Sequence, residues 1–190
     1  VSTSSNSEIS KSEEEEFYKN GSAQLLVNND EWKIVIPNTE EASVYFGRNT
    51  RWCTAATETT NYFGYYNKQG KLYIILQKKL NKRWQFHFES GQFMDEKDHQ
   101  ISQKDKNEIG NKSGVFNCID LSKDGNLIKH IPNPTVQQMM TAIKENALSV
   151  FYINDETQIP KEIYKSISIE DSHTLLGHSD KRVDDLYKAI

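Results

Sequence analysis

The chain has 190 residues, a formal net charge of −4 at pH 7 and 36% hydrophobic residues. Its length fits one domain with a small appendage, and 8 Phe, 9 Tyr and 3 Trp exclude disorder throughout. The acidic balance argues against general polyanion binding, and no apolar run is long enough to span a bilayer. The polar first residues do not predict a signal peptide.

The cysteine and histidine content argues against a metal site. Two cysteines, Cys53 and Cys118, are too few for a disulfide-stapled scaffold and favour a reduced cytoplasmic setting. They lack the C-x-x-C spacing, and the five histidines are scattered along the chain. We therefore expect no metal and no cofactor.

The N-terminal part begins with an acidic segment. Residues 1–19 are rich in Ser, Glu and Asn, which predicts a flexible tail or a fraying helix. Two apolar runs, 24–27 and 32–36, flank Asn28-Asn29-Asp30 and predict a β-hairpin. A short helix capped by Asn38 or Thr39 is expected next.

The middle of the chain alternates turn signals with apolar runs. Gly47 ends the short helix, and the loop 48–56 is expected to enter a second helix near Cys53. Residues 72–76 and 83–89 predict two strands, and the turn at Ser90-Gly91 leads into a further strand.

The core domain is expected to end near residue 131. The polar segment 96–113 predicts helix or loop, and residues 115–119 and 126–128 predict a last hairpin across Lys123-Asp124-Gly125. Residues 20–131 are thus predicted to form an α+β domain with a mainly antiparallel sheet and flanking helices.

Residues 132–190 have a different pattern. From Val136, apolar residues recur at i, i+3, i+4 and i+7, which is typical of a helix. Segments 160–168 and 182–190 are candidates for further short helices. We expect a small helical, repeat-like region that packs on the core domain, because so short a segment rarely folds alone.

Two segments carry recognisable motifs. One runs from Glu41 through G-x-x-T-x-W-C-T at residues 47–54 to Asp95, and the other is the helical unit from Asn133 to Asn146. They resemble uncharacterised bacteriophage and prophage proteins in which such a domain precedes short helical repeats beginning with Asn-Pro. The resemblance implies a viral origin, a location in the cytoplasm of an infected host cell or in the virion, and no particular activity.

Three residues form a candidate catalytic set: Cys53 at the expected helix start, His87 on a strand, and Asp95 after the next turn. Their order resembles papain-like and transglutaminase-like cysteine enzymes, in which a helix N-terminus lowers the pKa of the thiol and a histidine acts as base. The competing interpretation is that Cys53 belongs to a core corner and His87 is a satisfied polar residue, since no oxyanion element precedes Cys53.

The turn after residue 89 bears on this set. A three-residue turn at 90–92 would pair His87 with Asp95 on one face, whereas a two-residue turn would pair His87 with Met94. Sequence alone leaves both registers open.

Basic and aromatic residues form a second candidate site. Arg48 and Arg51 flank the loop before the expected helix and suit an anion, while Lys78–Lys82 are more simply solvating charges of a turn. An acidic turn at Asp95, Glu96 and Asp98 matches no cation-binding loop. The residues assigned to binding are Arg48, Thr50, Arg51, Trp52, Tyr65 and Arg83.

Two classes of function remain open. The first is a viral binding protein that acts on a host or viral macromolecule, with a host or viral protein as partner and a phosphate-bearing ligand or nucleic acid as the alternative. The second is a cysteine hydrolase or transferase. The small acidic chain without an oxyanion element favours the first, and no membrane partner is expected.

Overall fold

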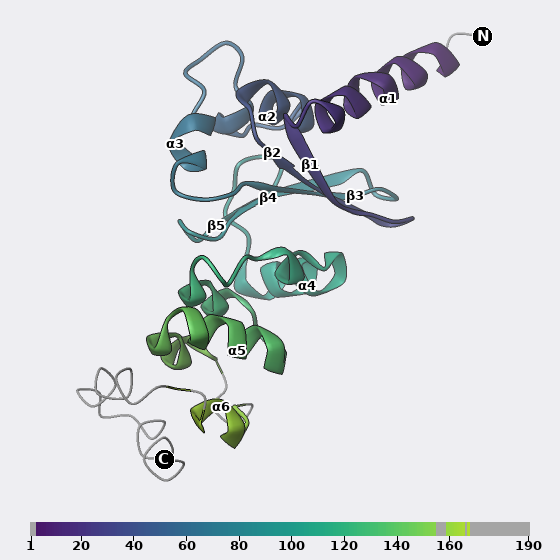
Figure 1. Ribbon diagram of the computed structural model, residues 1–190. Helices are drawn as coiled ribbons and strands as arrows, with labels where there is room; N and C mark the ends of the chain where they lie inside the picture. Colours follow the sequence, from purple (N-terminus) through teal and green to yellow (C-terminus); the bar gives the residue numbers. More distant parts are fainter. Residues whose placement is uncertain (1–2, 155–158, 166, 168–190) are drawn as a thin grey trace. The chain divides into compact units, whose positions relative to one another are not determined.

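The structure is a computed structural model that describes residues 3–154, 159–165 and 167. The chain forms two compact units that divide between Val115 and Phe116, earlier than the predicted boundary after residue 131. The first unit contains a five-stranded antiparallel sheet, and the second is built from short helices (Figure 1). The predicted α+β fold is confirmed.

The sheet of the first unit is a meander in which every strand pairs with its neighbours in sequence. Short turns join the first strand to the second and the third to the fourth and fifth, which favours antiparallel pairing, whereas residues 38–72 separate the second strand from the third. The strands are β1 (Ala23–Asn28), β2 (Trp32–Pro37), β3 (Tyr73–Gln77), β4 (Lys82–His87) and β5 (Gln92–Met94).

The predicted hairpin between β1 and β2 is confirmed. Asn29 closes its turn, because the side-chain oxygen accepts hydrogen bonds from the backbone N–H groups of Glu31 at 3.0 Å and Trp32 at 2.7 Å. A bulge interrupts the ladder between Leu25 and Val27.

Helices cover both faces of the sheet. In Figure 1, α1 (Thr3–Lys19), α2 (Glu40–Phe46) and α3 (Phe63–Asn67) lie on one side, and α4 (Gln103–Ser113) lies on the other. Buried residues of the strands, α2 and the loop after it form a core on the α2 side: Ala23, Val35, Ala42, Phe46, Trp52 and Ile74.

Side-chain caps fix the ends of α2 and α4. The Thr39 hydroxyl accepts from the Ala42 N–H at 3.2 Å, so Thr39 and not Asn38 caps α2. The polar segment 96–113 contains α4, where the Ser102 hydroxyl accepts from the Asp105 N–H at 3.1 Å. Gly114 ends α4 with a φ of 79°, a left-handed conformation that favours glycine.

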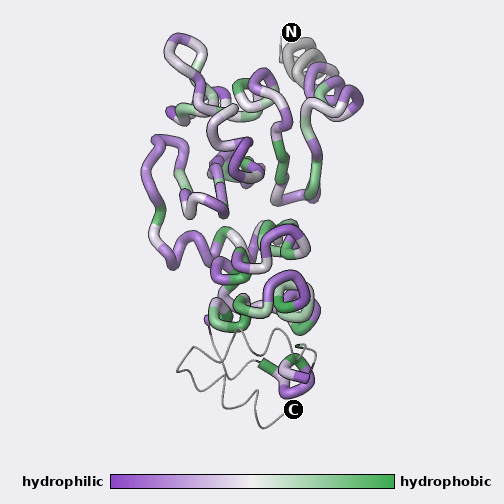
Figure 2. Tube along the Cα trace, turned by 60° about the vertical axis from the view of Figure 1, so that its left-hand side comes forward, coloured by the Kyte–Doolittle hydropathy of each residue, from purple (hydrophilic) through white to green (hydrophobic). Residues whose placement is uncertain are grey.

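The predicted acidic tail is helical from Thr3, as α1. Its coloured part is mostly hydrophilic (Figure 2), but its last turn carries two aromatic rings that contact the core. Phe17 and Tyr18 each lie 5.8 Å, between ring centroids, from Phe46. The flexible-tail interpretation missed this anchor, because the acidic run hides two apolar residues at its end.

The second unit contains η3 (Gly125–His130), α5 (Val136–Glu145), η4 (Ala147–Tyr152) and α6 (Lys161–Lys165). The predicted helix after residue 134 is confirmed as α5, and a capping box between Thr135 and Gln138 begins it. Part of the predicted segment 160–168 forms α6, whereas the segment 182–190 lies outside the described residues.

The hairpin predicted across residues 115–128 is wrong. Residues 115–118 and 125–130 form two 3₁₀ helices, with no strand at either segment. The reason is local, since the Asp124 carboxylate accepts from the Asn126 N–H at 3.0 Å and so begins a helical turn. Gly125 also permits close packing, because a Cβ there would lie 2.3 Å from the Ala142 carbonyl oxygen.

Candidate functional site

The loop after α2 is held by its own polar side chains. Thr50 Oγ1 donates to the Gly47 carbonyl oxygen at 2.6 Å, and the Trp52 N–H donates weakly to the same hydroxyl at 3.4 Å. The Trp52 ring is buried, and its indole N–H donates to the Asp95 carbonyl oxygen at 2.6 Å. Two of the predicted binding residues, Thr50 and Trp52, are therefore part of the loop's architecture.

The same loop brings Arg48 beside Arg83 of β4. The Arg48 guanidinium lies over the Tyr45 ring at 4.2 Å, and one of its nitrogens donates to the Tyr45 carbonyl oxygen at 2.7 Å. Arg83 Nη1 donates to the Arg48 carbonyl oxygen at 2.5 Å. Burial lowers the pKa of Arg83, and the nearby charge of Arg48 lowers it further.

Neither arginine forms an ion pair with a side chain of the described residues. Within the described residues, no carboxylate oxygen lies within 4.0 Å of a guanidinium nitrogen of Arg48 or Arg83. Besides burial, the charge of Arg48 lowers the pKa of Arg83 and the carboxylate of Glu96 raises it, so the repulsion between the two arginines is only partly compensated and an anionic ligand would relieve the rest.

A small cavity of about 40 Å³ lies at this point, lined by Lys33, Arg48, Arg83 and Glu14 together with apolar side chains. We call these four residues the arginine pocket. The Glu14 carboxylate, from α1, contacts the Lys33 ammonium and also accepts from the Tyr18 hydroxyl at 2.9 Å. A carboxylate of the chain itself thus already reaches the edge of the pocket.

Arg51 and Tyr65 do not line the arginine pocket. The exposed Arg51 uses its backbone N–H to donate to the Glu96 carbonyl oxygen at 2.9 Å. Tyr65 is 63% exposed and packs its ring edge-on against Tyr66, with centroids 5.3 Å apart.

The candidate nucleophile has a raised pKa. Cys53 begins a 3₁₀ turn of three residues and not the expected helix, so no helix N-terminus stabilises a thiolate there. Burial raises the pKa of the Cys53 thiol, and the negative charge of Asp98 raises it further. Both effects are opposite to those that activate a catalytic cysteine.

The candidate base is engaged elsewhere. His87 is buried, and its Nε2 lies 3.1 Å from the Tyr66 carbonyl oxygen, which can only accept, so Nε2 carries the proton. Nδ1 is then an acceptor and lies 2.7 Å from the Ser90 hydroxyl oxygen. Burial lowers the pKa of His87, although Glu89, with a carboxylate oxygen 3.7 Å from Nε2, acts in the opposite direction.

The two registers considered for His87 are both wrong. His87 pairs with Gln92, because residues 88–91 form a four-residue turn. The Asp95 carboxylate instead accepts hydrogen bonds from the backbone N–H groups of Lys97 at 2.8 Å and His99 at 2.9 Å. Asp95 therefore organises its own turn and does not orient His87.

Acidic residues do not gather into a cation site. Within the described part of the chain, no three His, Cys, Asp or Glu side chains are placed to hold a metal ion.

A larger feature lies on the opposite side of the sheet, and sequence reasoning missed it. An open groove of about 540 Å³ runs between the sheet and α4, with Trp84, Trp32 and charged residues in its lining. We call it the tryptophan groove. The sequence did contain a sign of this groove. Side chains alternate along β4, which predicts that Trp84 and Arg83 point to opposite faces of the sheet.

Comparisons with protein-family models, with curated proteins and with solved structures found no significant match for this chain. Each helix in the described part of the chain is too short or too polar to cross a membrane.

Proposed function

We propose that this protein is a non-catalytic binding protein that takes up an acidic segment of a host or viral protein at the arginine pocket. The observation that carries the proposal is the pair Arg48 and Arg83, which lie together without a carboxylate within 4.0 Å among the described residues. The resemblance to bacteriophage proteins would put this activity in an infected cell or in the virion.

The contact made by Glu14 supports this choice of ligand. Glu14, on a helix, already binds Lys33 at the edge of the pocket. A glutamate of a partner segment could therefore bind the pocket in the same way. Arg48 is exposed and accessible to such a partner. Guanidinium groups bind carboxylates through two parallel hydrogen bonds, which gives direction as well as attraction.

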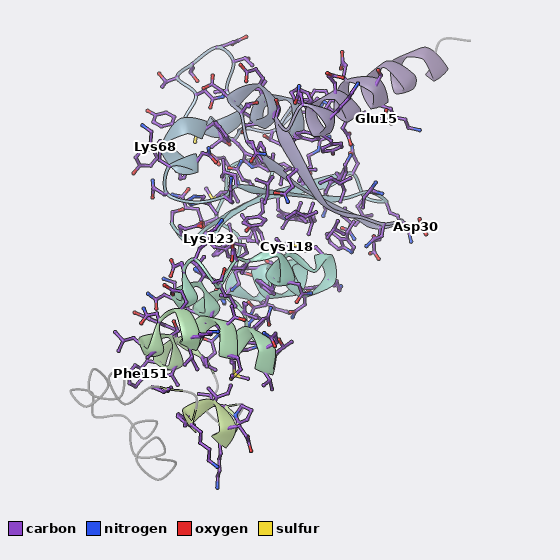
Figure 3. The ribbon with its side chains drawn as sticks, viewed as in Figure 1. Glu15, Asp30, Lys68, Cys118, Lys123 and Phe151 are labelled. Carbon is purple, nitrogen blue, oxygen red and sulfur yellow. The ribbon has the colours of Figure 1, made fainter. Side chains whose placement is uncertain are left out.

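A test uses the full chain and a synthetic Glu-rich peptide, with a Gln-rich peptide of equal length as control. We expect the Glu-rich peptide alone to bind, with an affinity that falls as salt is raised. Arg48→Ala should weaken binding by about tenfold, the loss of one charge-assisted contact. Lys68→Ala, at an exposed lysine after α3 (Figure 3), should leave it unchanged.

Glu14 provides a second arm of the test. Glu14→Gln removes the carboxylate that competes for the pocket, so the peptide should bind more tightly than to the unaltered chain. Equal affinity for the Glu-rich peptide in Arg48→Ala would contradict the proposal. Preference for a single-stranded oligonucleotide over the peptide would also contradict it and would assign the pocket to nucleic acid.

The cysteine hydrolase alternative gains no support from the site. His87 shares its hydrogen bonds with Tyr66 and Ser90, and the pKa of Cys53 is raised.

A further inference from the structure

The tryptophan groove lies on the face of the sheet that α4 covers, whereas the arginine pocket lies on the other face. Arg83 is the one described residue that lines both. Its volume of about 540 Å³ is within the range of small-molecule sites. A second hollow of about 560 Å³ shares Trp32 and Lys112 with it and reaches Asp30 at the tip of the β1–β2 hairpin (Figure 3). The two together form an elongated surface.

An aromatic pair forms one part of the lining. Trp32 is buried, while Trp84 is partly exposed, and their ring centroids are 6.1 Å apart with the planes tilted by 37°. Neither indole N–H donates a hydrogen bond to another residue in the described part of the chain. Trp84 therefore offers an accessible aromatic surface and a free donor at the groove.

The charges of the lining nearly cancel. The carboxylates are those of Asp95, Glu96, Asp105 and Glu108. The cations are those of Lys82, Lys97 and Lys112, because the Arg83 guanidinium binds the Arg48 carbonyl oxygen on the other face of the sheet. An anion entering the groove would meet the carboxylates and a cation would meet the ammonium groups, so neither gains a large net attraction.

The groove has hydrogen-bond acceptors and hydrogen-bond donors that no described residue uses. One carboxylate oxygen of Glu96 accepts from the Arg83 N–H, one of Asp105 accepts from the Ser102 hydroxyl, and one of Glu108 accepts from the Lys112 ammonium. The second carboxylate oxygen of each accepts a hydrogen bond from no described residue. The ammonium groups of Lys82 and Lys97 likewise pair with no described side chain. The groove thus presents unfilled acceptors and unfilled donors around one aromatic face.

We propose that the tryptophan groove binds a neutral oligosaccharide. A sugar hydroxyl both donates and accepts, which matches a lining of unused carboxylate oxygens and ammonium groups, and the C–H face of a sugar ring packs on an indole such as Trp84. An extended peptide is a poorer fit. It would bind by pairing its main chain with a strand edge, and the groove offers none because it lies between a sheet face and α4.

The experiment titrates the full chain with a panel of neutral di- to tetrasaccharides of glucose, galactose, mannose and N-acetylglucosamine, followed by tryptophan fluorescence and calorimetry. Sialylated and sulfated sugars and a neutral peptide complete the panel. We expect at least one neutral sugar to bind with a change in fluorescence. Trp84→Leu should weaken that binding at least about tenfold.

Two further variants keep the test decisive. Glu108→Ala alters an exposed residue of α4, where alanine favours the helix, and should weaken the sugar at least about fivefold even if Trp84→Leu does not fold. Tyr65→Leu, at an exposed aromatic ring outside the groove, should have no effect.

Arg48→Ala should also leave sugar binding unchanged, which separates this inference from the proposed function. Any of three results would overturn the inference: no neutral sugar binds, Trp84→Leu and Glu108→Ala bind it as well as the unaltered chain, or a charged sugar or the peptide is preferred.

Discussion

Arg83 and Trp84 are neighbours in β4, yet they serve opposite sides of one sheet. Arg83 pairs with Leu76 and reaches the Arg48 carbonyl oxygen, whereas Trp84 pairs with Ile75 and lies against Trp32. Alternation along a strand sends consecutive side chains to opposite faces, so one strand can supply two sites of different chemistry. The arginine pocket has surplus positive charge, whereas the charges of the tryptophan groove nearly cancel.

Trp52 and Trp84 differ in how much they contribute to the core. Trp52 is buried in the core and bonded to the Asp95 carbonyl oxygen, whereas Trp84 is partly exposed. We expect Trp52→Ala to reduce the free energy of unfolding by about 3–5 kcal/mol, because it leaves a large cavity. Trp84→Ala should reduce the free energy of unfolding by clearly less. Urea denaturation of both variants measures the difference, and equal losses would contradict the distinction.

Gly47 sets the distance between α2 and the loop that carries Arg48. A Cβ at this position would lie 2.6 Å from the Ala55 Cβ and 2.8 Å from the Ser43 carbonyl oxygen. Gly47→Ala should therefore destabilise the protein by about 1–3 kcal/mol through overpacking.

Gly64 is the matched control, since a Cβ there has no atom within 4 Å. Gly64→Ala, inside α3, should leave stability unchanged or raise it by up to about 1 kcal/mol. Thermal melting of the two variants decides the question. If Gly47→Ala melts like Gly64→Ala, the close approach is not a constraint.

His87 should make stability depend on pH. Burial holds its folded pKa below the usual 6.5, so the unfolded chain binds more protons as pH falls through 6.5. The His87 contribution is fully present above this value and is lost toward the lower folded pKa. Between about pH 7.5 and about pH 5, His87→Gln should therefore lose less unfolding free energy than the unaltered chain. A steeper loss in the variant would show that Glu89 dominates.

The fold should tolerate loss of the exposed arginines of the loop after α2. Arg48 and Arg51 are both exposed, so Arg48→Ala with Arg51→Ala should shift the free energy of unfolding by no more than about 0.5 kcal/mol. Binding of the Glu-rich peptide should nevertheless fall. A large loss of stability with peptide binding retained would make the arginines structural.

The smallest effect is expected at the cysteines. Burial raises the pKa of both Cys53 and Cys118, so iodoacetamide should modify Cys53 no faster than Cys118 at neutral pH. Mass spectrometry of the labelled chain gives the two rates. Fast modification of Cys53 that His87→Ala abolishes would restore the enzymatic alternative.

Local signals in the sequence were sufficient for most of the elements. The apolar runs predicted the paired strands, and a capping residue followed by a helical pattern predicted α2 and α5. These predictions succeed because period-two burial and side-chain caps act over a few residues. The hairpin expected across residues 115–128 failed for the same local reason, since Asp124 as a cap outweighs weak strand patterns.

The sites depended on contacts that no local pattern encodes. The turn at residues 88–91 is one residue longer than the longer of the two turns considered for Ser90-Gly91, and it pairs His87 with Gln92 in place of Asp95. A shift of one residue moves a side chain to the other face, so the sequence could not decide which groups meet. The meeting of Arg48 with Arg83, and the groove between α4 and Trp84, follow from packing between distant segments, which only the tertiary structure determines.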